Sequence, residues 1–255
     1  MDDYRLSGLW ARSLAQREAD VFSVAREALR AAYISFRERA GLLAAEIGRD
    51  LPEYTVHDLT HLDALWTTAD VIAGPEFELT PPEAFVLGGA VLTHDLAMSR
   101  AAATVRGPLQ HDVRWLDALA AEMRLSLRRP PSPAELQAPP SEVEERVTQL
   151  MLRELHAEHA ALLATSAWRD RSSDVEYWLI DDVELRSTFG NLIGQVAESH
   201  WWPAHSLGER FPTRLGAPSR FPRVWEVDPL KVACLLRLAD AAHIDARRAL
   251  SLIHI

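Results

Sequence analysis

Residues 86–99, VLGGAVLTHDLAMS, carry an apolar segment directly into a histidine and an aspartate. The apolar run predicts a helix with buried surroundings, and His94 and Asp95 stand at its end. Burying two such polar side chains costs free energy unless something binds them. The stretch therefore indicates a helical core that carries a polar site at the end of one helix.

Outward from this stretch, apolar residues recur at spacings of three and four along most of the chain, with Ala, Leu, Glu and Arg between them. This period and this composition are typical of α-helices. Alternating runs that would indicate strands are nearly absent, so the predicted fold class is an all-α bundle. Helices are predicted within 9–47 (two of them) and over 59–72, 80–96, 141–163, 183–200 and 228–249.

Three local patterns refine this outline. Thr80, two prolines and Glu83 predict a helix N-terminus, because threonine caps the first turn and proline is tolerated within it. Ser141 and Glu144 predict a capping box for the next long helix. The intervening residues 128–141 hold five prolines, and we interpret them as a surface loop inserted into the domain rather than as a docking motif.

Ten histidines are many for 255 residues, and they are unevenly placed. His57 and His61 lie one helical turn apart, and His156 and His200 fall within or at the end of later predicted helices. Asp240 closes the apolar run KVACLLRLAD. A helical bundle can point such groups into one cavity. Imidazole and carboxylate ligands without thiolate suit first-row divalent metals such as Mn, Fe, Co, Ni or Zn.

Other chemistry-bearing residues have ordinary structural explanations. His111 and Asp112 form a second His-Asp pair, but their surroundings are typical of a helix start. Trp201 and Trp202 could stack a nucleotide base, although aromatic pairs at a helix end more often belong to a core or a lid. We interpret the remaining histidines of interest as solvent-facing or loop residues (His159, His205) and as a helix cap (His243).

The order of these motifs resembles the superfamily of HD-domain metal-dependent phosphohydrolases. Within it the chain is most similar to the HD-CE type, which is often found ahead of an Hsp90-like ATPase domain in one bacterial chain. The stretches that carry the resemblance are YTVHDLTHLDAL (54–65), AVLTHDLAM (90–98), RELHAEHA (153–160) and LLRLADAAHIDARRA (235–249). The resemblance implies an HD-type metal-binding domain over residues 51–249, with residues 1–50 as N-terminal helices packed on it.

The resemblance also implies a ligand set for one or two divalent ions (Mn, Fe, Co, Ni, Mg or Zn). Members with two metals use additional histidines from intervening helices. His156 and His200 occupy such places here, with Asp95 as the implied bridge. The four positions that match the ligands of the first metal are His61, His94, Asp95 and Asp240.

The implied activity is that of a phosphohydrolase or phosphodiesterase acting on a nucleotide-like phosphoester. A divalent ion lowers the pKa of bound water and neutralises phosphoryl charge, and two ions ~3.5 to 4 Å apart clamp the attacking and leaving oxygens. Asp95 is then catalytic through the metal it holds. Arg153, one turn before His156, is predicted to bind phosphate, and His57, one turn before His61, to hold a ligand in place or transfer a proton.

Two hypotheses from other function classes compete with the hypothesis that the protein is an enzyme. The first is a non-catalytic module that senses metal and nucleotide and regulates a downstream Hsp90-like ATPase domain. The second is a helical scaffold with a degenerate site, which the presence of all four core ligand positions disfavours. The chain contains no Walker-type Gly-rich loop, so the sequence does not support ATP use by this segment itself.

Composition restricts partners and location. The formal net charge of −10 argues against coating duplex DNA or an anionic membrane by bulk attraction. Cys234 is the single cysteine, which excludes an intrachain disulfide and a Cys-based zinc finger. No run approaches the ~18 to 20 apolar residues of a spanning helix. We expect a cytoplasmic protein.

The C-terminal residues 250–255, LSLIHI, lack a helix cap and match the translation of a transposon-derived adapter end. We expect them to be a non-native tail on a truncated chain. In that case the natural protein continues past about Ala249, with the ATPase domain as the partner that the resemblance implies.

Overall fold

Helix α4, Pro81–Thr93, is the centre of the fold, and all of its residues are buried. The computed structural model describes residues 3–52, 58–169 and 175–243. A helix that is apolar on every side must be surrounded by other elements. Thr80 caps α4 as predicted: its hydroxyl accepts from the Glu83 backbone N–H, and the Glu83 carboxylate accepts from the Thr80 N–H at 2.9 Å.

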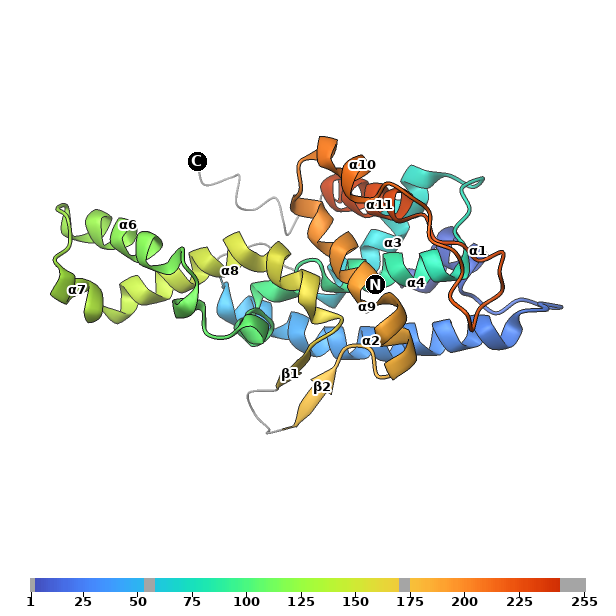
Figure 1. Ribbon diagram of the computed structural model, residues 1–255, viewed down its shortest axis with the longest axis horizontal. Helices are drawn as coiled ribbons and strands as arrows, with labels where there is room; N and C mark the ends of the chain where they lie inside the picture. The colour runs from blue at the N-terminus through green and yellow to red at the C-terminus, as the bar shows by residue number, and fades with distance from the viewer. Residues whose placement is uncertain (1–2, 53–57, 170–174, 244–255) are drawn as a thin grey trace.

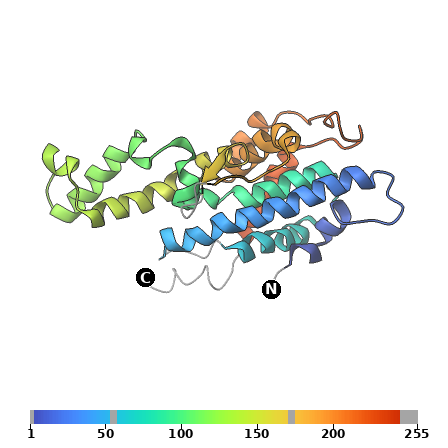
Figure 2. The ribbon, with the colours of Figure 1, turned by 90° about the horizontal axis from the view of Figure 1, so that it is seen from below.

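The helices around α4 form the body of the molecule (Figures 1 and 2). The longer helices that pack directly on α4 are α2 (Ser23–Asp50), α9 (Val183–Glu198), α11 (Pro229–Ala242) and α3 (Leu59–Ala73). Helix α8 (Ser141–Leu163) covers α9, and α1 (Gly8–Ser13) lies on α3, where the Gly8 N–H donates to Asp70 at 2.7 Å. The predicted all-α fold is confirmed. Among the described residues the only sheet is an antiparallel pair, β1 (Ala167–Arg169) with β2 (Glu176–Trp178).

Short elements complete the chain between these helices. The 3-10 turns are η1 (Tyr4–Leu6), η2 (Leu96–Met98), η3 (Thr104–Arg106), η4 (Leu109–His111), η5 (Ser199–Trp201) and η6 (Ala204–Ser206). The short α-helices are α5 (Arg100–Ala103) and α10 (Leu207–Arg210). Turn η5 continues directly from α9, and η2 follows α4 after His94 and Asp95, so both carry the chain past the ends of those helices.

An arm extends from the body, built from α6 (Trp115–Leu127), α7 (Pro133–Gln137) and the first half of α8 (Figure 1). It has its own apolar cluster, in which Trp115 and Met123 of α6 pack against Val147 of α8. The Pro-rich insertion 128–141 forms the tip of the arm. It is not a loop throughout, because Ser132 and Glu135 make a capping box that starts α7.

One predicted capping box and the predicted end of the last helix differ from the structure. The predicted capping box of Ser141 is wrong: Pro140 is the N-cap of α8, no side chain caps it, and Ser141 is already helical. The last helix was expected over 228–249, and α11 ends at Ala242. Residues 244–249 and the expected non-native tail, 250–255, lie outside the described residues.

Helices α8 and α9 approach each other at Gly194. A Cβ atom built on Gly194 would lie 2.0 Å from the Ala161 carbonyl oxygen, so only glycine permits this backbone contact. His156 lies five residues before Ala161 on α8, and His200 follows α9. The contact therefore sets the separation of the two elements that carry these histidines.

We predict that Gly194→Ala lowers the free energy of unfolding by about 1–3 kcal/mol, because the methyl group forces two helix backbones apart. The matched control is Gly48→Ala on α2, where an added Cβ meets nothing within 4 Å. That change should stabilise the protein by about 0.5–1 kcal/mol through helix propensity. Urea denaturation of both variants measures the difference, and equal effects would contradict the packing argument.

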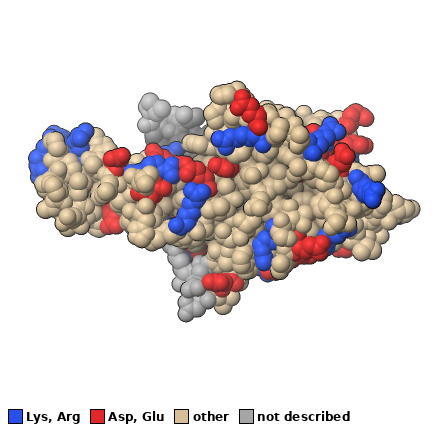
Figure 3. All heavy atoms as spheres, viewed as in Figure 1, with Lys and Arg blue, Asp and Glu red and all other residues tan. Residues whose placement is uncertain are grey.

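The surface carries both charge signs. On the face shown in Figure 3, acidic and basic side chains are interspersed among uncharged ones, without a continuous basic track. This distribution agrees with the net charge of −10. In the part of the chain that the structure describes, no helix combines the length and apolarity needed to cross a bilayer.

Candidate metal centre

Six elements direct histidine and aspartate side chains toward one region of the body. His61 lies in the first turn of α3, which starts there because the Asp58 carboxylate accepts from the Thr60 and His61 N–H groups. His94 caps the C-terminus of α4, and Asp95 follows it into η2. The remaining ligand candidates are His156 on α8, His200 on η5 after α9, and Asp240 in the last turn of α11.

The first group of candidate ligands is His61, His94, Asp95 and Asp240, whose donor atoms all lie within 4.8 Å of one another. His94 Nε2 is 3.1 Å from Asp95 Oδ2 and 3.7 Å from Asp240 Oδ1. Two donors that each lie ~2.0–2.3 Å from one first-row ion are at most about 4.6 Å apart. Both distances meet that limit.

The second group is Asp95, His156 and His200, on the same distance criterion. The two imidazoles meet at 2.9 Å between their Nε2 atoms. Asp95 Oδ1 lies 3.5 Å from His156 Nε2 and 3.9 Å from His200 Nε2. Asp95 thus belongs to both groups, with one oxygen toward each.

Backbone contacts fix the orientation of three of these rings. Each Nδ1 atom lies within hydrogen-bond distance of the carbonyl oxygen three residues earlier: His94 with Val91 at 2.8 Å, His156 with Arg153 and His200 with Ala197 at 2.5 Å. A ring that donates from Nδ1 directs its Nε2 into the cluster, and this is the atom that binds metal once it carries no proton. The donor set and its orientation therefore fit a divalent ion.

The electrostatics of the cluster favour a cation. Burial alone would lower the pKa of His94, but the carboxylates of Asp95 and Asp240 outweigh it and raise that pKa well above its usual range. Burial and the neighbouring His94 lower the pKa of His200 to about 4, so its imidazole is neutral at pH 7. The carboxylates that hold a proton on His94 are equally suited to a divalent metal ion.

Comparison with known families agrees with this geometry. The sequence profile of the HD-CE family matches residues 51–254. The chain belongs to the HD-CE family. No curated protein and no solved structure matches it. The match contains all six candidate ligands of this HD-CE domain and leaves α1 and α2 outside.

Two further residues support the ligands of the HD-CE domain, and the sequence analysis missed both. His243, interpreted there as a helix cap, ends α11 and also places its Nδ1 2.9 Å from Nδ1 of His61. Arg237 donates to the carbonyl oxygens of Ser199 and Trp202, at 2.8 Å for Trp202, and so ties α11 to the segment that carries His200. The sequence contained a signal for both residues. Arg237 and His243 each lie three positions from Asp240, and this spacing puts all three on one face of a helix.

The remaining predicted site residues are placed less directly. Arg153 is exposed, and its backbone carbonyl oxygen lies 2.5 Å from Nδ1 of His156. His57 lies outside the described residues. Asp112 hydrogen-bonds to Arg114, in keeping with a structural role, and His205 is exposed. The interpretation of His159 as solvent-facing is wrong, because only 3% of its surface is exposed.

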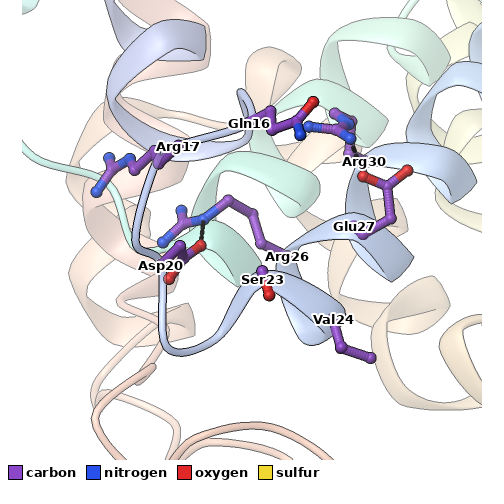
Figure 4. A pocket seen from close by; sticks show the side chains of 8 residues that line it. All are labelled: Gln16, Arg17, Asp20, Ser23, Val24, Arg26, Glu27 and Arg30. Carbon is purple, nitrogen blue, oxygen red and sulfur yellow. Dashed lines mark hydrogen bonds and ion pairs between the residues drawn. The ribbon is translucent and has the colours of Figure 1, made fainter.

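A cavity of about 340 Å³ at the start of α2 contains no histidine among its lining residues (Figure 4). Four of its charged groups form two ion pairs. Arg26 donates to Asp20 at 2.6 Å, and Arg30 pairs with Glu27. The histidine–aspartate cluster is therefore the candidate functional site of the HD-CE domain.

Proposed function

We propose that this HD-CE domain is a metal-dependent phosphohydrolase or phosphodiesterase that acts on a nucleotide-like phosphoester. One observation carries the proposal: Asp95 is shared by two ligand groups, with Oδ2 toward His94 and Oδ1 toward His156 and His200. A shared carboxylate is what a two-metal phosphoesterase needs to set the spacing of its ions.

The donor sets indicate how the ions would be held. His61, His94 and Asp240 would complete one site around Asp95, and His156 and His200 would complete the other. A bound pair of divalent ions lowers the pKa of water and neutralises charge on the phosphoryl oxygens. We assign contact with the substrate phosphate to Arg153, which is exposed one turn before His156.

The nucleotide-like character of the substrate is supported by Trp201. Its ring centroid lies 5.0 Å from that of His156, and 63% of its surface is exposed, which is unusual for tryptophan. Trp202 has a different role, because it stacks on Phe211 and carries the Arg210 guanidinium over its face. An exposed aromatic ring beside the cluster suits stacking of a base.

The proposal is tested by metal analysis of the purified protein, followed by a screen of nucleotides and generic phosphodiesters with added Mn²⁺. We expect bound divalent metal and metal-dependent product, detected as released phosphate or monoester. Metal-dependent nucleotide binding without any product after hours at micromolar protein would overturn the proposal in favour of a sensing module. Product formation that is unchanged when a chelator removes the metal would contradict both the hydrolase and the sensing module.

A further inference from the structure

A second polar cavity, of about 190 Å³, borders α8 one helical turn beyond His156. We call it the His159 cavity. It lies between α8 and the chain that runs from η3 to η4, where Gly107 turns the backbone at a φ of 103°. Its lining residues are Arg106, Gly107, Pro108, Leu109, His111, Asp112 and His159.

We take the buried side chain of His159 as evidence that this cavity holds a ligand. Its side chain is 3% exposed, yet Nδ1 has no hydrogen-bond partner among the described residues. Buried polar atoms in proteins nearly always have a partner, and one without a partner needs an explanation. Burial and the charge of Arg106 lower the pKa of His159, so the ring is neutral and can donate one hydrogen bond and accept another.

The carboxylates around the cavity are already committed to Arg114. This guanidinium donates to both oxygens of Asp112, at 2.8 and 3.0 Å, and to both oxygens of Glu158 at the same distances. The hydrogen bonds from Arg114 lower the pKa of Asp112 to about 2. Neither carboxylate therefore needs a cation from the cavity.

Arg106 is the cation that remains available. Its closest carboxylate, Glu158, is 3.9 Å away, and half of the Arg106 side chain is exposed. A guanidinium with open donors at the edge of a polar cavity is suited to bind phosphate oxygens in a bidentate manner. His111, exposed at the opposite end of the lining segment, adds a further donor.

We propose that the His159 cavity binds a phosphoryl group, either as free phosphate or as the part of a substrate that lies away from the metal centre. The second possibility, that the phosphoryl group is part of the substrate, rests on the proposed function. The volume is below the roughly 300 Å³ at which sites for whole small molecules begin, so it suits one phosphoryl group rather than a complete nucleotide. The charges of Arg106 and Arg114 balance those of Asp112 and Glu158. The affinity for a phosphoryl group therefore comes from hydrogen-bond donors directed at it, and we expect that affinity to be modest.

The direct test uses inorganic phosphate and the Asp95→Asn protein, in which the metal centre cannot compete for the anion. Phosphate is titrated while the imidazole NMR signals are followed, with His159 assigned from a His159→Gln variant. We expect a saturable shift of the His159 signals, and at least about tenfold weaker binding after Arg106→Gln, the equivalent of about 1.4 kcal/mol. Arg124→Gln, an exposed arginine on α6, is the matched control and should bind as the parent does.

A kinetic arm distinguishes the two sources. If the phosphoryl group belongs to the substrate, Arg106→Gln raises KM for nucleoside diphosphates while KM for monophosphates stays unchanged. If it is free phosphate, the variant alters inhibition by added phosphate alone. Absence of any saturable His159 shift would overturn the proposal. Absence of turnover would overturn the proposed function and leave the binding test intact.

Discussion

Replacing Asp95 with asparagine is expected to remove metal from both ligand groups and to reduce turnover by at least about a hundredfold. Even partners outside a ligand set typically change metal affinity or activity by 10–100-fold. Asp95 contributes more, because its two oxygens face His94 on one side and His156 and His200 on the other. Metal content after dialysis and the rate on the best substrate of the screen measure the loss.

The control for this prediction is Asp117→Asn, an exposed aspartate in the first turn of α6 that should leave both quantities unchanged. Circular dichroism checks that both proteins fold, which is expected because asparagine matches aspartate in shape. Metal-dependent product that survives Asp95→Asn would place the chemistry outside the cluster and refute the assignment.

The double variant His156→Ala/His200→Ala is expected to lose about one of two metal equivalents and nearly all activity. The other group keeps its three donors besides Asp95, namely His61, His94 and Asp240, so the first ion should remain. Inductively coupled plasma mass spectrometry after equilibrium dialysis counts the metal.

His205→Ala provides the matched control, because His205 is an exposed histidine on the short turn η6. Its metal content and activity should equal those of the parent. Unchanged metal content in the double variant would show that the centre holds a single ion, and the two-metal part of the proposed function would then be wrong.

Local patterns were sufficient to predict most of the fold. The apolar run before His94 predicted a buried helix, and α4 is buried along its whole length, including Glu83 in its first turn, which pairs with Lys231 at 2.6 Å. Thr80 and Glu83 marked its start correctly. The corresponding prediction that Ser141 caps α8 is wrong, because Pro140 takes the N-cap position. A capping-box pattern does not show whether the preceding residue will take that position instead.

The candidate ligands could be predicted as a set only through the family resemblance. Spacing along one helix relates Asp240 to Arg237 and His243, but the contacts that matter join different elements: Arg237 reaches the chain after α9, and His243 reaches His61. Burial of His159 likewise depends on the η3 to η4 segment folding back onto α8. Such contacts follow from how the helices pack, which no single stretch of sequence specifies.

If both ligand groups bind metal, the shared position of Asp95 would make the two metal equilibria interdependent. An ion in either group would fix the carboxylate and so reduce the conformational entropy that the second ion must overcome, while the repulsion between two dications acts in the opposite direction. The difference is a coupling free energy, and by thermodynamic linkage it is the same whichever ion binds first. A metal titration of this protein should therefore be fitted with an interaction constant rather than as two independent sites.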